Sequence, residues 1–117
     1  CGIPAQQEED TSSEITVQDL DRRIKEGKNS FVILDVREPF EYEISKIEGS
    51  VLIPLGQIPE RFGELNPDSE YIVHCKMGGR SAKAVDFLKQ KGFKRVRNLA
   101  GGINRWAQEV DHNLPTY

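Results

Sequence analysis

The sequence lacks the features that mark several common classes of protein. It has only two cysteines, far apart, which make a poor disulfide framework, and no second cysteine stands near Cys1 to form a zinc pair. No apolar run approaches the length of a membrane span, and no signal-peptide pattern is visible. A formal net charge of −3 gives no sign of a nucleic-acid surface. We therefore expect a soluble, cytoplasmic protein with no metal, cofactor, membrane or nucleic-acid partner.

The 117 residues fit one domain of ordinary size with a short segment at each end. Residues 1–14 are polar and acidic without a periodic apolar face, which is the pattern of a flexible linker. Because the chain does not begin with methionine, we expect a fragment in which Cys1 is left over from an upstream domain. The domain itself is expected over residues 15–113, and residues 114–117 form a tail.

Strand and helix patterns alternate through the domain. Thr16 can cap a helix over residues 17–26, which Gly27 ends, and the apolar run 31–36 indicates a strand buried on both faces. The remaining patterns predict a short strand at 51–54, a short helix at 58–65, a strand ending at Cys75, a helix from Ser81, a strand at 95–99 and a last helix after Gly101-Gly102. This alternation predicts an α/β fold with a central, mostly parallel sheet and helices on both faces. Ligands of such folds bind at the carboxyl ends of the strands.

The stretch around Cys75 has the composition of an anion cradle. Cys75 ends an apolar run, a loop with Gly78 and Gly79 follows, and an amphipathic pattern begins at Ser81. Backbone N–H groups of such a loop, the dipole of the following helix and the charge of Arg80 all favour a thiolate. The alternative is an inert core thiol at the end of a strand, which the glycines, the arginine and the helix start disfavour.

Cys75 is thus the candidate nucleophile, and the next six residues are candidates for holding a substrate: Lys76, Met77, Gly78, Gly79, Arg80 and Ser81. We expect Arg80 to bind an anionic donor by its charge, with a contribution from its planar fork. The alternative is that Arg80 only organises the loop.

Other titratable residues are expected to support the site or to lie outside it. Asp35 stands in a buried run and needs a partner, so we expect Asp35 and Arg37 to brace the site from a neighbouring strand end, in preference to direct acid or base chemistry. His74 adjoins Cys75, but neighbouring strand residues point to opposite faces, so its imidazole should pack in the sheet. His112 is expected in solvent.

Four segments resemble, in family order, the motifs of rhodanese-like sulfurtransferases, over about residues 15 to 110. The loop 75–81, CKMGGRS, resembles the active-site loop of that family. The other segments are LDVREPFEY at 34–42, similar to DVRxxxEY, IEGSVLIP at 47–54, similar to IxGAxxIP, and LAGGINRW at 99–106, similar to GGxxxW. Lys46 departs from the family, which often has histidine there, so no role of that histidine is carried over.

The resemblance implies a rhodanese fold and an enzyme that carries sulfane sulfur as a persulfide on Cys75, taken from thiosulfate or from a cysteine desulfurase. Phosphatase chemistry is one alternative, but the related cysteine phosphatases have a longer loop than the four residues between Cys75 and Arg80. A silent rhodanese-like binding module is another alternative, although such modules commonly lack the cysteine.

The loop pattern CKxGxRS, with residues 1–3 and 114–117, also resembles rhodanese domains fused behind adenylyltransferases of the molybdopterin and thiamine pathways. This finer resemblance implies two partners. They are an upstream adenylyltransferase domain and a small ubiquitin-like sulfur-carrier protein, whose adenylated carboxyl terminus becomes a thiocarboxylate. A stand-alone thiosulfate:cyanide sulfurtransferase is the alternative, and the donor and the pathway stay open.

Overall fold

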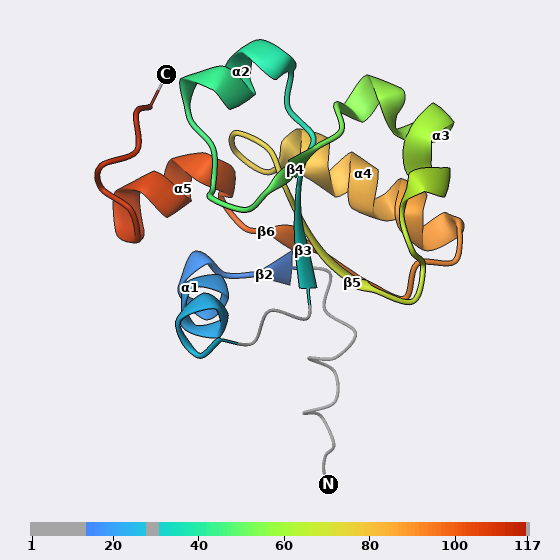
Figure 1. Ribbon diagram of the computed structural model, residues 1–117, viewed down its shortest axis with the longest axis horizontal. Helices are drawn as coiled ribbons and strands as arrows, with labels where there is room; N and C mark the ends of the chain where they lie inside the picture. The colour runs from blue at the N-terminus through green and yellow to red at the C-terminus, as the bar shows by residue number, and fades with distance from the viewer. Residues whose placement is uncertain (1–13, 28–30, 117) are drawn as a thin grey trace, which may run out of the picture.

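The computed structural model describes residues 14–27 and 31–116. These residues form a five-stranded sheet with the order β2-β6-β5-β3-β4, in which every neighbouring pair is parallel. The predicted α/β fold is confirmed, and the sheet is parallel throughout rather than mostly parallel. Helices lie on both of its faces (Figure 1). Residues 1–13 of the expected linker, Cys1 among them, lie outside the described residues.

The three central strands carry the site at their carboxyl ends. They are β3 (Phe31–Asp35), β5 (Glu70–His74) and β6 (Arg95–Leu99). The edge strands are short: β4 (Val51–Leu52) and β2 (Glu14–Ile15), whose first residue had been expected in the linker. Asp35 is the register partner of His74, so β3 and β5 end side by side immediately before Cys75.

Buried apolar side chains form one cluster on each face of the sheet, and the helices pack over them in two layers. Ile72 and Val73, neighbours on β5, belong to different clusters, as the two-residue period of a strand requires. Helices α1 (Val17–Lys25) and α5 (Gly102–Glu109) pack on the Ile72 side, and α4 (Gly79–Gln90) packs on the Val73 side. The predicted core stripe of the last helix is therefore confirmed, with Ile103 and Trp106 buried.

The expected helices are found with shifted ends. Helix α1 begins after Thr16, whose hydroxyl accepts the Asp19 N–H at 3.1 Å, and Gly27 follows it with φ +76°. The helix expected from Ser81 begins two residues earlier, because Gly78 takes the capping position with φ +116°. The helix expected at 58–65 divides into α3 (Ile58–Arg61) and a 3-10 turn (Phe62–Glu64), which follow another 3-10 turn (Leu55–Gln57).

Helix α2 (Pro39–Ile44) is missing from the predicted elements. It is six residues long, and its large apolar side chains Phe40 and Ile44 are exposed, so it has no apolar stripe. Its start is fixed locally instead, by Pro39 in the first turn and by a capping box in which the Glu38 N–H donates to Glu41 Oε1 at 2.8 Å.

Candidate active site

Cys75 directly follows β5 at the carboxyl edge of the sheet, and only 1% of its surface is exposed. Donors of the following loop surround its sulfur. The Gly78 N–H donates to Sγ at 3.1 Å, the Ser81 N–H donates at 3.4 Å, and the Ser81 hydroxyl lies 3.4 Å from Sγ. The residues from Gly78 to Ser81 therefore form a cradle that stabilises a negatively charged sulfur.

The cradle lowers the pKa of the Cys75 thiol below its ordinary value. Burial acts in the opposite direction, because it disfavours the charged form. The hydrogen bonds from the Ser81 hydroxyl and from the backbone N–H groups of Ser81, Gly78 and Met77 outweigh burial. The direction of this shift is the one expected of a nucleophilic cysteine.

The two loop glycines have different roles. Gly78 needs its positive φ of 116° to turn its N–H towards the sulfur and to cap α4. Gly79 is the first residue of α4, does not take a positive φ, and would meet nothing within 4 Å if it carried a Cβ. The conformational freedom of glycine is therefore used at Gly78 and not at Gly79.

Asn98, near the end of β6, holds the cradle from the neighbouring strand. Its Nδ2 donates to the Gly78 carbonyl at 3.1 Å, and its Oδ1 lies 2.5 Å from Ser81 Oγ. The single proton of the Ser81 hydroxyl therefore has three acceptors within reach: Asn98 Oδ1, the Gly78 carbonyl oxygen at 3.2 Å and Cys75 Sγ. Asn98 is not among the residues predicted from the sequence, although the end of a strand next to β5 is the place where such a residue meets the loop.

Arg80 points to Glu41 of α2. Arg80 Nη1 donates to Glu41 Oε1 at 2.7 Å and Nη2 donates to Oε2 at 3.0 Å, a bidentate pair in which the Glu41 side chain is only 6% exposed. The expected contact of Arg80 with a donor stays a prediction, and the pair favours the alternative that Arg80 organises the loop. Glu41 is a further residue of the site that is not predicted from the sequence.

Asp35 and Arg37 form a fully buried ion pair that fixes α2. Arg37 Nε donates to Asp35 Oδ1 at 2.9 Å and Nη2 donates to Oδ2 at 2.6 Å. The same guanidinium donates to the carbonyl oxygen of Ser45 at 2.6 Å and to that of Glu41 at 3.4 Å. The pair therefore connects the end of β3 to α2, and α2 to the loop through Glu41 and Arg80.

His74 is buried beneath the loop and faces Asp35. Its Nδ1 lies 3.2 Å from the Cys75 carbonyl oxygen, and its Nε2 lies 3.6 Å from Asp35 Oδ2. Burial lowers the pKa of His74, against a smaller opposing effect of the Asp35 charge. The two ring nitrogens thus face the Cys75 carbonyl and Asp35 rather than Sγ, and the ring packs in the sheet as expected, whereas His112 is exposed.

The amino end of α5 holds the first residues of the loop. The Ile103 N–H donates to the Cys75 carbonyl at 2.9 Å, and the Asn104 N–H donates to the Lys76 carbonyl at 3.1 Å. This contact requires glycine at position 102, because a Cβ there would stand 2.5 Å from the Lys76 carbonyl oxygen. The predicted Gly101-Gly102 turn thus fixes the loop backbone.

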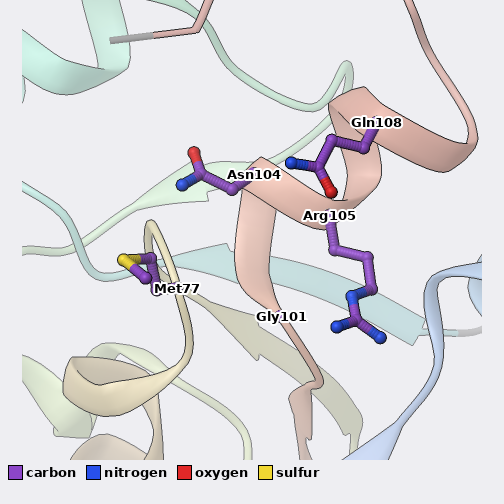
Figure 2. A pocket seen from close by; sticks show the side chains of 5 residues that line it. All are labelled: Met77, Gly101, Asn104, Arg105 and Gln108. Atoms are coloured by element: carbon purple, nitrogen blue, oxygen red, sulfur yellow. The ribbon is translucent and has the colours of Figure 1, made fainter.

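Met77 stands at the tip of the loop with 69% of its surface exposed. It lines a pocket of about 230 Å³ together with Gly101, Asn104, Arg105 and Gln108 from the start and one side of α5 (Figure 2). Cys75 does not line this pocket, which adjoins the cradle through Met77. The loop therefore has a covered side that holds the sulfur and an open side that faces α5.

The chain belongs to the rhodanese-like domain family, which residues 16–109 match. It is similar to a rhodanese-related protein from Thermoplasma volcanium of known structure, with 39% sequence identity and a TM-score of 0.75, covering 83% of this chain and 92% of that one. It is 34% identical over 103 residues to a protein named sulfurtransferase from Allochromatium vinosum, covering 88% of this chain and 92% of the relative. The rhodanese fold implied by the sequence motifs is therefore confirmed.

A longer relative is the probable adenylyltransferase/sulfurtransferase MoeZ of Mycobacterium tuberculosis. The identity is 33% over 121 aligned residues, which cover 100% of this chain and 31% of the relative. The chain also spans less than two thirds of other curated relatives that it matches, 39% of one and 52% of another. The resemblance to rhodanese domains of such two-activity proteins is thus confirmed.

Within residues 14–27 and 31–116, no three histidine, cysteine or acidic side chains stand close enough together to hold a metal ion. In the same ranges, no helix has the length and apolar character needed to cross a bilayer.

Proposed function

We propose that this protein is a sulfurtransferase that carries sulfane sulfur as a persulfide on Cys75 and delivers it to the carboxyl terminus of a small sulfur-carrier protein. The observation that carries the proposal is the cradle, in which a sulfur of lowered pKa is surrounded by N–H and O–H donors. The same donors stabilise the negative charge of a persulfide. The names of two relatives, a sulfurtransferase and an adenylyltransferase/sulfurtransferase, agree with it.

In the loading step, the Cys75 thiolate attacks the outer sulfur of thiosulfate. A bond forms between the two sulfur atoms, the sulfur–sulfur bond of thiosulfate breaks, and sulfite leaves with the bonding electron pair. A cysteine desulfurase persulfide is the alternative donor, and its cysteine thiolate then leaves instead. The lowered pKa of Cys75 favours either reaction near neutral pH, because it raises the thiolate fraction.

In the delivery step, the outer sulfur of the persulfide attacks the carbonyl carbon of the adenylated carrier, and AMP leaves. The carrier is then bound to Cys75 through two sulfur atoms. A thiol attacks the sulfur of Cys75, which releases the carrier as a thiocarboxylate and leaves Cys75 in a disulfide with that thiol. A second thiol then attacks the partner sulfur of this disulfide, forms a new disulfide with it and releases the Cys75 thiolate. Because this step consumes thiols, it suits a reducing compartment, and we place the reaction in the cytoplasm.

The burial of Cys75 limits the kind of acceptor. Because 1% of Cys75 is exposed, a broad protein surface does not reach the sulfur, whereas a small molecule or a thin chain end does. A carrier with an extended carboxyl terminus meets this requirement. Cyanide also meets it, which makes a thiosulfate:cyanide sulfurtransferase the second candidate.

The experiment that tests the proposal offers both acceptors to the loaded protein. The chain is treated with thiosulfate, freed of excess donor, and mixed with a small sulfur-carrier protein, an adenylyltransferase, ATP and a thiol. Intact-mass spectrometry should show that the carrier gains a thiocarboxylate, with no gain when Cys75→Ser is used. A persulfide that forms normally and reacts with cyanide, but never with the adenylated carrier, would exclude the carrier as acceptor.

A further inference from the structure

The pocket beside the loop is lined by a side of α5 that does not pack in the core. Asn104, Arg105 and Gln108 are spaced so that they share one side of the helix, next to its capping residue Gly101. The core residues Ile103 and Trp106 lie on the opposite side and are buried. The polar side is thus available to a partner without any change in the core.

The opposite wall of the pocket is an exposed methionine. Met77 follows Cys75 by two residues and is the most exposed of the large apolar side chains in the described part of the chain. Figure 2 shows its side chain at the loop tip, across from Asn104. Methionine is flexible and polarisable, and it is often used where a surface must adapt to a bound chain.

The polar groups of the pocket match the groups of a polypeptide backbone. The amides of Asn104 and Gln108 each offer donors and an acceptor, as a peptide group does. The stem of Arg105 lies over Gly101, since a Cβ at that glycine would stand 2.6 Å from Arg105 Cβ. Arg105 Nε is 3.6 Å from Glu109 Oε2, and both side chains are more than one third exposed, so this ion pair is weak and its donors can serve a ligand.

The pocket is rigidly connected to the reacting residue. The Ile103 and Asn104 N–H groups hold the carbonyl groups of Cys75 and Lys76 at 2.9 and 3.1 Å, so α5 and the loop keep a fixed relation. A chain bound between Met77 and α5 is therefore held beside the residue that carries the sulfur.

We propose that this pocket binds the extended carboxyl-terminal segment of the acceptor protein, with Asn104, Arg105 and Gln108 holding its backbone and Met77 covering it. The inference rests on the proposed delivery of sulfur to a chain end, because that delivery supplies the partner. It adds the surface that holds the segment while its last residue enters the cradle.

Binding is measured with the full chain carrying Cys75→Ser, so that no sulfur transfer takes place. The probe is a synthetic peptide with the carboxyl-terminal sequence of a sulfur-carrier protein, ending in a free carboxylate. Its dissociation constant and the shifts of the Met77 methyl and α5 amide NMR signals are recorded. Arg105→Ala and Asn104→Ala should each weaken binding by about tenfold, the effect of losing one or two good hydrogen bonds.

Arg61→Ala is the matched control, because Arg61 also pairs with a carboxylate a few residues ahead, Glu64 in the 3-10 turn, but lies on α3. Equal binding by all variants, no binding of the peptide at all, or shifts on α5 caused by thiosulfate alone would overturn the inference. The two proposals can fail separately. If the peptide binds as expected but the wild-type protein never thiolates the carrier, the pocket assignment stands and the proposed delivery of sulfur is wrong. If the carrier is thiolated normally but Arg105→Ala and Asn104→Ala leave peptide binding unchanged, the delivery of sulfur stands and the pocket assignment is wrong.

Discussion

The guanidinium of Arg80 and the carboxylate of Glu41 form a two-point contact, at 2.7 and 3.0 Å, across 39 positions of the sequence. Glu41 also accepts the N–H of Glu38, so one carboxylate caps α2 and holds the first turn of α4. Through this pair, the position of the catalytic loop depends on α2. The loop is thus held by a second element as well as by its own hydrogen bonds.

The Arg80–Glu41 pair predicts that geometry matters more than charge at position 80. Arg80→Lys keeps the charge but loses the planar fork, so it should lose nearly as much thiosulfate turnover as Arg80→Ala, on the order of tenfold to a hundredfold. Glu41→Gln should show a similar loss, although it leaves the Arg80 charge in place. Turnover is compared with thermal melting to exclude unfolding. Retained or increased turnover in Glu41→Gln would instead support donor binding by Arg80.

The cradle predicts an acidic thiol whose pKa depends on Ser81. The rate of iodoacetamide modification of Cys75 should have its inflection below the ordinary thiol pKa of about 8.5, because a lowered pKa gives more thiolate at each pH. Ser81→Ala removes the hydroxyl donor, so the inflection should move to higher pH. Ser45→Ala, a buried serine outside the cradle, should leave it unchanged. An unshifted inflection in Ser81→Ala would mean that the Ser81 hydroxyl donates to Asn98 Oδ1 and not to Sγ.

Alanine substitutions at two glycines with positive φ distinguish the cost of backbone strain from the cost of a steric clash. Gly27→Ala, with φ +76° and open space around it, should lose about 1–2 kcal/mol of stability from strain alone. Gly102→Ala, with φ +62°, should lose more, because its Cβ would stand 2.5 Å from the Lys76 carbonyl oxygen. It should also lower turnover by moving the loop. Both variants are checked by denaturant unfolding and by thiosulfate turnover. Equal losses of stability at the two positions would contradict the close packing of Gly102 against the Lys76 carbonyl.

Burial of His74 predicts a loss of stability in mild acid. Its pKa is lowered in the folded protein, so below about pH 6.5 the unfolded chain takes up a proton that the folded protein does not. The free energy of unfolding should therefore fall with decreasing pH, with a contribution of up to about 1.4 kcal/mol per pH unit. His74→Gln should remove this contribution, and His112→Gln, at an exposed position, should keep it. Equal pH slopes in wild type and His74→Gln would contradict the assignment.

The sequence was sufficient to predict elements with a clear apolar pattern. Strands β3 and β5 are buried runs, and α5 has a regular core stripe, so their existence follows from local composition. Helix α2 could not be predicted in this way. Phe40 and Ile44 are exposed and its buried residue is the charged Glu41, so its position depends on Arg37 and Arg80 rather than on an apolar face.

The candidate site could likewise be predicted only where its residues are close in the sequence. The donors Met77, Gly78 and Ser81 follow Cys75 within six residues of the sequence, so loop chemistry could identify them. Asn98 and Glu41 come from distant parts of the chain, and only the sheet order and the place of α2 bring them to the loop. The direction in which Arg80 points is likewise a property of the fold, which the loop sequence does not contain.

The proposed function requires that Cys75 alone carry the transferred sulfur. Wild-type chain and Cys75→Ser are treated with thiosulfate, and intact-mass spectrometry with peptide mapping then locates any added sulfur. We predict one added sulfur atom on Cys75 in the wild type and none in the variant, with unchanged thermal melting. An added sulfur atom on Cys75→Ser at any residue other than Cys1, or a wild-type protein that takes up no sulfur, would contradict the account.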